Sequence, residues 1–374
     1  MKRGGFHEIR ELHFEDGSTC IGRFTRNKSE SVSVPEGEIA TTKFVRRHTS
    51  IPVPETYFTN LNPEHVVGAA FVLVEKMPGK DLYEMWNTTS LEHKIAIIGQ
   101  VAGVVHQLSM LKFDKIGSLN ANGEVGLLDN SAYSNDAHSR GPFATTTNYL
   151  KSFVQPREGH SKELAKSYNN VESLVASFMS NQRPSSILEP PFRLTHGDFD
   201  GQNMLFVQPD PVQSPQLSAI LDWDQSHAGP LYYLLDYPVF IRDFDLPDQR
   251  HQYGDNKVLR QHFFYCLSRY WPKGSRQREE VLECFRQKSF TLNTFRNTFM
   301  KFPMQDSEHE KRALDGFLDG HKPGTLRYKF AFPYGGKALW EPDSEVESED
   351  EDGSHEGVDA EVKVWQGLGS MTLW

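Results

Sequence analysis

The sequence predicts an α+β fold with two lobes, a small β-rich lobe followed by a larger helical lobe. Short apolar runs separated by turns occupy the chain up to Glu75, a pattern typical of strands. After Ser90, apolar side chains recur mainly at helical spacing. Between these parts, residues 76–79 (KMPG) change from polar residues to a turn and indicate a hinge. Two lobes that meet at a hinge enclose a cleft, where ligand sites are common.

The small lobe begins with a predicted hairpin. Residues 6–14 and 18–24 flank an acidic-glycine turn, which is typical of a β-hairpin. Residues 35–48 begin with a proline and acids and end with basic residues, the charge order that stabilises a helix. Residues 49–54 (TSIPVP) are extended, because the residue before each proline avoids the α region. Residues 68–75 (GAAFVLVE) form a buried strand that leads into the hinge.

The larger lobe is predicted to be mostly helical. Ser90 is a candidate N-cap for a core helix that continues to residue 108. Residues 148–179 are helical with an interruption near residues 156–160, and two more helices follow at residues 258–271 and 279–295. We therefore expect a small lobe over residues 1–77 and a helical lobe over residues 78–340.

The end of the chain has a different composition. Residues 341–361 contain 11 acidic residues and no Lys or Arg. Such a segment cannot bury enough apolar surface to fold, so we expect it to be disordered or to serve as an acidic tail for a protein partner. Residues 362–374 form a separate tail with two tryptophans. Without the acidic segment, the chain has 39 acidic and 40 basic residues. The net charge of -10 of the whole chain therefore originates in residues 341–361.

Two stretches carry the candidate chemistry, residues 195–208 (THGDFDGQNMLFVQ) and 217–230 (LSAILDWDQSHAGP). The residues between them are typical of a turn, which predicts an antiparallel hairpin. In the simplest register Asn203 lies opposite Asp222, close enough to share an ion, and Asp198 lies in the loop ahead of the first strand. Oxygen ligands of this kind suit Mg²⁺, which takes its other ligands from water and phosphate.

These residues resemble the aminoglycoside phosphotransferase and choline kinase-like family, in its fungal-type form. The pattern H-G-D-x-x-x-x-N is present as His196, Gly197, Asp198 and Asn203, and I-D-W-[DE] as residues 221–224 with Leu in place of Ile. The alternative is a polar loop between two core strands. The resemblance extends from residue 4 to about residue 335. It implies a two-lobed, protein-kinase-like fold and ATP-dependent transfer of a phosphoryl group to a hydroxyl of a small molecule.

The resemblance also implies roles at the centre of the site. Asp198 orients or deprotonates the acceptor hydroxyl, and His196 braces the catalytic loop. Asn203 and Asp222 hold Mg²⁺ on the phosphates of ATP. Positioning and charge stabilisation supply most of the acceleration in this chemistry, without a covalent enzyme intermediate.

Further residues are assigned to the nucleotide by the same resemblance. Arg23 takes the place of the family's strand lysine, which contacts the phosphates, and Glu38 pairs with it; alternatively, they are a surface arginine and a first-turn acid. Glu75 and Met77 lie at the hinge, where backbone groups recognise adenine, unless this is a plain exit from a strand. Gly5 matches the end of the glycine-rich loop, although two glycines near a terminus are also simply flexible. The family has another strand ahead of these glycines, and we expect that strand to be missing here.

Several classes of partner and compartment are disfavoured. No basic stripe or basic amphipathic segment is present, so neither nucleic acid nor an anionic membrane is a favoured partner. The three cysteines are far apart and odd in number, which indicates free thiols in a reducing compartment. The N-terminus has no apolar leader and no apolar run reaches membrane length, so we expect a cytoplasmic protein.

Two rival functions follow from the same residues. A protein kinase is disfavoured, because the activation segment ending in A-P-E is missing after Asp222, and a small-molecule acceptor is expected instead. A catalytically inactive kinase-like binding or scaffold protein is suggested by the missing strand, by Arg23 and by the acidic tail. The intact Asp198, Asn203 and Asp222 argue against it. The motifs leave the acceptor open among aminoglycosides, choline-like metabolites and secondary metabolites.

Overall fold

The fold is that of a computed structural model of the chain. It describes residues 2–3, 7–25, 36–62, 64, 66–128, 140–155, 159–180, 186–242, 254–285, 292–293, 295, 307–320, 330–331 and 337–338. The chain divides into two compact units, Met1–Leu339 and Trp340–Trp374. The acidic segment at residues 341–361 and the tail at residues 362–374 lie outside the described residues, and so does Gly5.

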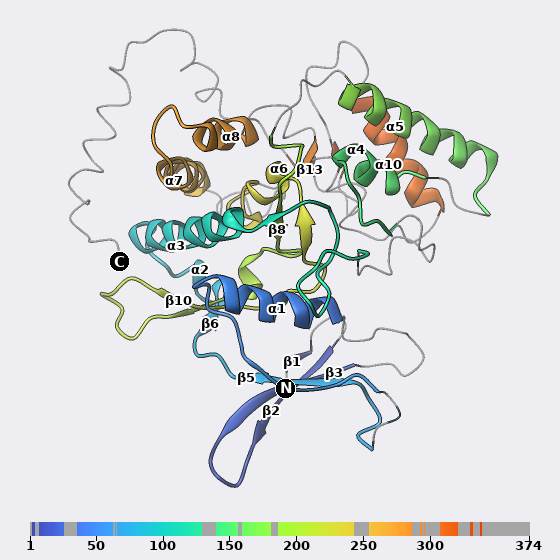
Figure 1. The fold of residues 1–374 in the computed structure, drawn as a ribbon. Helices are drawn as coiled ribbons and strands as arrows, with labels where there is room; N and C mark the ends of the chain where they lie inside the picture. Colours follow the sequence, from blue (N-terminus) through green and yellow to red (C-terminus); the bar gives the residue numbers. More distant parts are fainter. Residues whose placement is uncertain are drawn as a thin grey trace, which may run out of the picture. The chain divides into compact units, whose positions relative to one another are not determined.

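A five-stranded antiparallel sheet with the order β1-β2-β3-β5-β4 forms the small lobe (Figure 1). Its strands are β1 (Lys2–Arg3), β2 (His7–His13), β3 (Thr19–Thr25), β4 (Thr56–Asn60) and β5 (Phe71–Glu75). The β2–β3 hairpin confirms the sequence prediction, and Asp16 closes its turn by accepting from the backbone N–H of Ser18 at 2.8 Å. The two-residue β1 pairs with β2, so a short first strand precedes the glycines.

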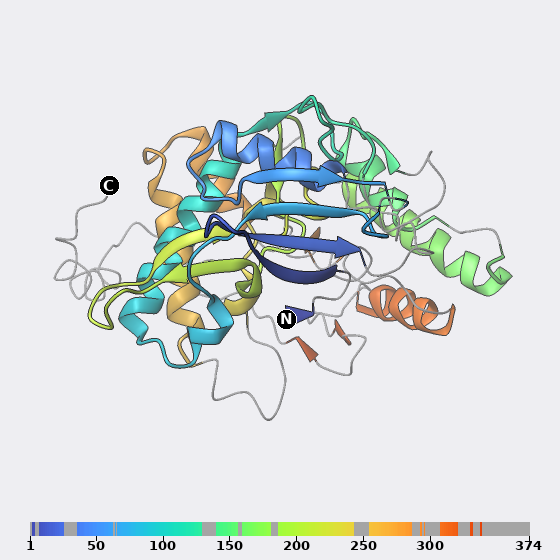
Figure 2. The ribbon, with the colours of Figure 1, turned by 90° about the horizontal axis from the view of Figure 1, so that it is seen from below.

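Helix α1 (Glu36–His48) follows the hairpin, as predicted, with its acids in the first turn and its basic residues in the last. Glu38 and Val45 are on its buried face. The extended segment that follows is joined to strand β10 (Gln216–Ile220), because the carbonyl of Pro52 accepts from the backbone N–H of Ile220 at 2.8 Å. Seen from below, the strands of the sheet lie side by side (Figure 2).

The predicted antiparallel hairpin after the catalytic motif is present, but its register differs from the simplest one. Strands β9 (Met204–Val207) and β10 (Gln216–Ile220) pair antiparallel, and β6 (Lys80–Asp81) adds to the other side of β9. Continued from the Met204–Ile220 pair, the register places Asn203 opposite Leu221 and not Asp222. At the other end Gln216 pairs with Val207, and a bulge at Ser218 shifts the register by one residue between the two ends. The hydroxyl of Ser218 donates to the carbonyl of Pro78 at 2.6 Å. The residue left unpaired by the bulge therefore binds the chain that leaves the hinge.

Gly79 shows how closely the hinge crosses this hairpin. Its φ is +113°, and a Cβ there would lie 2.6 Å from the backbone oxygen of Phe206. Only glycine therefore allows the chain after β5 to pass over β9, and the hinge is fixed against the strand that follows the catalytic loop.

The rest of the described chain is mainly helical, as predicted. The helices are α2 (Leu82–Trp86), α3 (Leu91–Met110), α4 (Thr146–Ser152), α5 (Lys162–Ser180), α6 (Leu231–Leu234), α7 (Asn256–Arg269), α8 (Arg276–Cys284) and α10 (Ser307–Gly320). Short 3₁₀ turns are η2 (Gly201–Asn203) and η3 (Val239–Ile241), and the remaining strands are β7 (Lys112–Phe113), β8 (Phe192–Thr195), β11 (His227–Gly229), β12 (Phe330–Ala331) and β13 (Lys337–Ala338).

Helix α3 is the centre of the larger lobe. Ser90 caps it by accepting from the backbone N–H of His93, as the sequence predicted, and its apolar face is fully buried. It packs on α7 and on β8, the strand that leads into the catalytic loop. Figure 1 shows α7 beside α3 and α8 on the far side of α7, while α4, α5 and α10 form a separate group of helices. Among the described residues, no helix is both long and apolar enough to span a membrane.

Candidate active site

The catalytic loop is held by the buried imidazole of His196. Strand β8 delivers this residue between β7 and β11, and only 4% of it is exposed. Its Nε2 lies 2.9 Å from the carbonyl of Leu221, and its Nδ1 lies 3.1 Å from the backbone N of Asp198. A carbonyl only accepts and a backbone N–H only donates, so the proton is on Nε2 and Nδ1 is an acceptor. Burial lowers the pKa of His196, which keeps it neutral in this bridge.

The chain next to His196 also packs closely on residues 223–224. A Cβ at Gly197 would lie 2.6 Å from the backbone oxygen of Asp224, so the glycine of the motif is required by packing. Trp223 is 1% exposed and its ring lies 4.7 Å from the imidazole of His196. Asp224 accepts from the backbone N–H of Gln225 at 2.8 Å and caps the following turn. The two motifs of the sequence are therefore packed against each other.

Asp198 is half-buried and one of its carboxylate oxygens is held. Oδ2 accepts from Nε2 of Gln202 at 2.8 Å and from Nδ2 of Asn203 at 3.0 Å. Nδ2 of Asn203 also donates to the carbonyl of Asp198 at 2.9 Å. No described residue donates to Oδ1 of Asp198 or to Oδ1 of Asn203. Each side chain thus keeps one oxygen with lone pairs for a further partner.

Asp222 follows β10 in a left-handed conformation, with φ at 57°. Few residue types other than Gly, Asn and Asp adopt this region readily. Its side chain is 46% exposed, and its Oδ1 accepts from Nη2 of Arg23 at 3.0 Å. Arg23 donates through Nη1 to Glu38. One guanidinium therefore joins carboxylates from α1 and from the β9–β10 hairpin.

The Arg23–Glu38 pair is buried, which changes both pKa values. Burial raises the pKa of Glu38 to about 7, and the attraction of Arg23 offsets only part of this effect. Burial alone would lower the pKa of Arg23, but the carboxylates of Glu38 and Asp222 outweigh burial and raise it. Oε2 of Glu38 is buried and has no hydrogen-bond partner among the described residues. The structure thus brings Glu38 to Arg23, the pair that the resemblance implied.

The donor set of the hairpin fits a magnesium ion. The open oxygen of Asn203 and the carboxylate of Asp222 are hard ligands, and their backbones adjoin because the carbonyl of Asn203 accepts from the N–H of Leu221 at 2.8 Å. Within the described residues, no group of three or more His, Cys, Asp or Glu side chains is placed to hold a metal. A dedicated protein cage is therefore absent from this part of the chain. Mg²⁺ commonly binds through one or two carboxylates while keeping water or phosphate ligands.

The hinge residues lie where the sequence placed them. Glu75 ends β5, and its Oε2 accepts from the backbone N–H of Glu55 at 3.0 Å and lies 3.6 Å from Nη1 of Arg46. Its side chain is therefore directed to neighbours in the small lobe. Met77 is half-buried between β5 and β6. Their backbones connect the sheet to the larger lobe.

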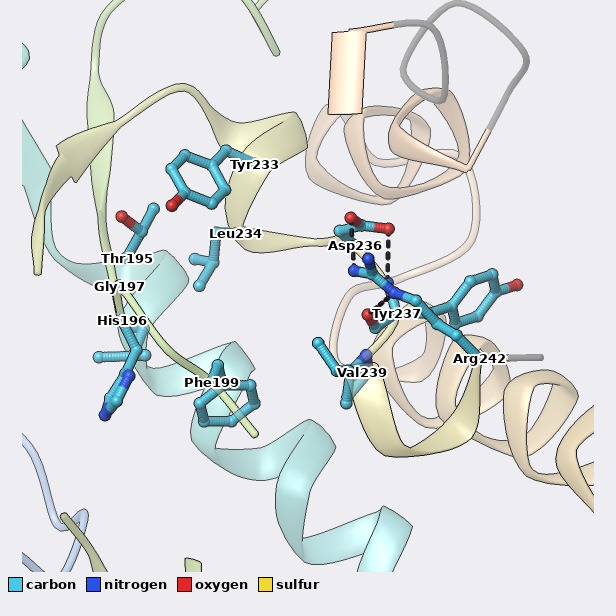
Figure 3. Close-up of a pocket in the computed structure, with 12 residues that line it drawn as sticks. Thr195, His196, Gly197, Phe199, Tyr233, Leu234, Asp236, Tyr237, Val239 and Arg242 are labelled. Atoms are coloured by element: carbon cyan, nitrogen blue, oxygen red, sulfur yellow. Dashed lines mark hydrogen bonds and ion pairs between the residues drawn. The ribbon is translucent and has the colours of Figure 1, made fainter. Parts of the chain in front are cut away.

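A small cavity of about 40 Å³ lies behind the catalytic loop (Figure 3). His196, Gly197 and Phe199 form one wall, and the opposite wall carries an ion pair between Asp236 and Arg242, 2.6 Å apart. Asp198 is not among the residues that line it. The cavity is therefore not the space beside the carboxylate of Asp198. A volume of this size holds a few water molecules.

Sequence reasoning missed several residues that build the site. Tyr83 of α2 donates to Oδ1 of Asp200 at 2.6 Å, and the same oxygen caps the backbone N–H of Gly201 at 2.8 Å. Gln202 binds Asp198 as described. Asp200 and Gln202 occupy the variable positions of H-G-D-x-x-x-x-N, and Tyr83 is far from it in sequence. No signal in a single sequence marks Tyr83, whereas polar residues inside the motif were a usable hint for Asp200 and Gln202.

Comparison with known proteins gives two kinds of match. The model of the phosphotransferase enzyme family matches residues 12–255. Two subtelomeric hrmA-associated cluster proteins, from two strains of Aspergillus fumigatus, are each 28% identical over 120 residues. The match covers 32% of this chain and 24% of each relative, so the chain spans about a quarter of the length of these curated relatives.

Solved structures share the fold. A thermostable mutant of aminoglycoside phosphotransferase APH(4)-Ia in its apo form has a TM-score of 0.50 at 12% identity, over 86% of this chain and 94% of that chain. A ternary complex of such a mutant with AMP-PNP and hygromycin B has the same TM-score and identity, over 86% and 93%. The predicted two-lobed, protein-kinase-like α+β fold is confirmed by this likeness and by the sheet-and-helix arrangement.

Proposed function

The chain belongs to the phosphotransferase enzyme family, and from this premise we propose that it transfers the terminal phosphoryl group of ATP to a hydroxyl of a small molecule. The arrangement around Asp198 carries the proposal. One oxygen of this carboxylate is held by two amides while the other is open, next to the Asn203–Asp222 pair that suits a cation. A neighbouring structure that holds both AMP-PNP and hygromycin B supports a nucleotide and a small-molecule acceptor as the two substrates.

On the acceptor side, Asp198 and His196 have different roles. Asp198 accepts the proton of the acceptor hydroxyl through Oδ1 and aligns that oxygen for attack. His196 fixes the backbone N–H of Asp198 relative to Leu221, so it acts as a positioning residue. This fixed geometry lowers the barrier by presenting the hydroxyl in a reactive orientation.

The cofactor side uses a different group of residues. Asn203 and Asp222 would hold Mg²⁺, and Arg23, anchored by Glu38, would face the phosphates. Backbone groups near Glu75 and Met77 would bind the adenine, and Gly5, which lies outside the described residues, would also contact the nucleotide. When bound, Mg²⁺-ATP supplies the phosphoryl group and the positive charge that balances its oxygens.

A screen for ATP consumption with a library of hydroxyl-bearing metabolites and aminoglycosides tests the proposal. We expect at least one compound to stimulate ATP consumption by the wild-type chain, and Asp198→Asn to remove that stimulation. Stimulation that persists in Asp198→Asn would overturn the assignment of Asp198. Thermal shift with Mg²⁺-ATP is the accompanying test of nucleotide binding.

A second candidate, a kinase-like binding or scaffold protein without activity, is favoured by one observation. Arg23 already bonds the carboxylate of Asp222 that the proposal gives to the cation. This candidate predicts no thermal shift with Mg²⁺-ATP and no ATP consumption with any acceptor. The acidic segment at residues 341–361 would then serve a protein partner.

Location remains part of the proposal. Cys20, Cys266 and Cys284 are not joined in disulfides, a pattern that a reducing compartment favours. We propose the cytoplasm, which also supplies ATP. Fluorescence microscopy of a tagged chain checks this, and a signal confined to the secretory pathway would contradict it.

A further inference from the structure

An exposed glutamine lies next to the proposed catalytic carboxylate and has no role assigned so far. Gln202 is the middle residue of η2 (Gly201–Asn203), and its side chain is at the surface. Its Nε2 donates to Oδ2 of Asp198 at 2.8 Å, a normal hydrogen-bond length. Exposed glutamines lose side-chain entropy when they are fixed in this way. The bond deserves an explanation because its acceptor is the carboxylate of Asp198.

Two amide donors meet on a single oxygen of Asp198. Asn203 supplies the second one, through Nδ2 at 3.0 Å. The carbonyl of Asp198 is also held, by Nδ2 of Asn203 and by the backbone N–H of Asp200, both at 2.9 Å. Rotation of the carboxylate about its Cβ–Cγ bond would break both bonds to Oδ2. The open Oδ1 thus has one direction in which to accept a proton.

From this geometry we infer that Gln202 is a positioning residue for phosphoryl transfer, holding Asp198 with Oδ1 toward the acceptor hydroxyl. The inference rests on the proposed function of Asp198. Without Gln202, Oδ2 of Asp198 keeps one side-chain hydrogen bond, from an amide that also donates to the carbonyl of Asp198. An amide donates without adding charge, so Gln202 orients the carboxylate without neutralising it.

The backbone that carries Gln202 is itself fixed from outside the loop. Tyr83 donates to Oδ1 of Asp200 at 2.6 Å, and this oxygen also caps Gly201. A Cβ at Gly201 would lie 3.4 Å from the ring of Tyr83, so α2 and η2 are in close contact. The backbone at Gln202 is therefore held in place by α2, the helix that follows the hinge. The distance from this backbone to Asp198 is fixed by the same contacts.

The test compares Gln202→Met and Gln202→Glu with the wild-type full chain. Methionine keeps the length of the side chain and removes the donor, and glutamate keeps the shape but replaces the donor with an acceptor. The matched control is Gln216→Met on β10, because Gln216 is also exposed and also makes one amide bond, to the carbonyl of Ser214 at 3.1 Å. It changes the same chemical group away from the catalytic loop.

Crystal structures of the nucleotide-free proteins give the first readout. We expect Asp198 in one orientation in the wild type and in Gln216→Met, and rotated or split between orientations in both Gln202 variants. A single, unchanged orientation in the Gln202 variants would overturn the inference. This readout needs neither ATP turnover nor a known acceptor.

ATP hydrolysis with water as the acceptor, together with AMP-PNP calorimetry, gives the second readout. We expect kcat to fall about 10- to 100-fold in both Gln202 variants, as for a misplaced reacting group, with KM for ATP and affinity for AMP-PNP within about twofold. An unchanged kcat, or a loss of AMP-PNP affinity as large as the loss of kcat, would overturn it. A wild-type chain that does not bind AMP-PNP would instead reject the proposed function, while the crystal structures still decide whether Gln202 orients Asp198.

Discussion

The two carboxylates of the proposed site are held in opposite ways. Asp198 is fixed by neutral amides within its own loop, at most five residues away in sequence. Asp222 is fixed by the charged side chain of Arg23, 199 residues away and in the other lobe. The orientation of the proposed base is therefore a local property of the catalytic loop, whereas the position of the proposed metal ligand depends on both lobes being together. Changes at the two carboxylates should separate rate from cofactor binding.

The largest effect is expected at Asp222. Asp222→Ala removes a proposed ligand of Mg²⁺ and the link to Arg23, so Mg²⁺-ATP binding and turnover should both be lost. The residue is 46% exposed, so the melting temperature should change little. Calorimetry with Mg²⁺-AMP-PNP and thermal melts check this. Retained binding and turnover in a folded variant would remove Asp222 from the metal site.

Asp198→Asn should separate the rate of phosphoryl transfer from the binding of Mg²⁺-ATP most clearly. Without a carboxylate to take the proton, kcat should fall by about 10²- to 10⁴-fold. Mg²⁺-ATP should still bind, since Arg23, Asn203 and Asp222 are intact. Calorimetry and steady-state kinetics on one preparation measure both quantities. An unaltered rate would refute the role given to Asp198, and lost nucleotide binding would show that the two carboxylates act as one unit.

Arg23→Lys tests the link between the lobes. An ammonium group is a single point charge and cannot bond Glu38 and Asp222 with the two arms of a planar fork. We expect about tenfold weaker binding of Mg²⁺-AMP-PNP. Arg276→Lys is a suitable control, because Arg276 is 78% exposed and its ion pair with Glu280 lies within α8. Equal affinity in Arg23→Lys and the wild type would show that the fork is not used.

The last effect is on stability alone, a pH dependence that originates at Glu38. Its pKa in the folded chain is about 7, above its ordinary value of 4.5, so folding takes up a proton between these two pH values. The free energy of unfolding therefore falls as pH rises from about 4.5 to about 7, by at most about 1.4 kcal/mol per pH unit. Glu38→Gln should lack this contribution. Urea denaturation of both proteins at several pH values measures it, and identical slopes would contradict the raised pKa.

The local side of the site was predictable from the sequence. Ser90 and the spacing after it located α3, and the acidic-glycine turn located the β2–β3 hairpin. The motif spacing put Asp198 and Asn203 on one loop ahead of β9. These features depend on residues close together in the chain, where turn chemistry, caps and periodicity act directly.

The non-local side was only partly predictable. The register of β9 and β10 differs from the simplest one, by one residue at Asn203 and by two at Val207. It changes along the hairpin at the bulge at Ser218, whose hydroxyl donates to the carbonyl of Pro78 near the hinge. The Asp236–Arg242 pair and the Tyr83–Asp200 bond had no motif to mark them. Each depends on which distant segments pack together, and neither turn composition nor period encodes that information in one sequence.

Placement of the cation is the most direct test of the account. A crystal structure of the full chain with Mg²⁺ and AMP-PNP should show one ion bound by Oδ1 of Asn203 and a carboxylate oxygen of Asp222, each at about 2.1 Å. Oδ1 of Asp198 should face the terminal phosphate. An ion that contacts neither Asn203 nor Asp222, or a nucleotide bound without any ion between them, would contradict it.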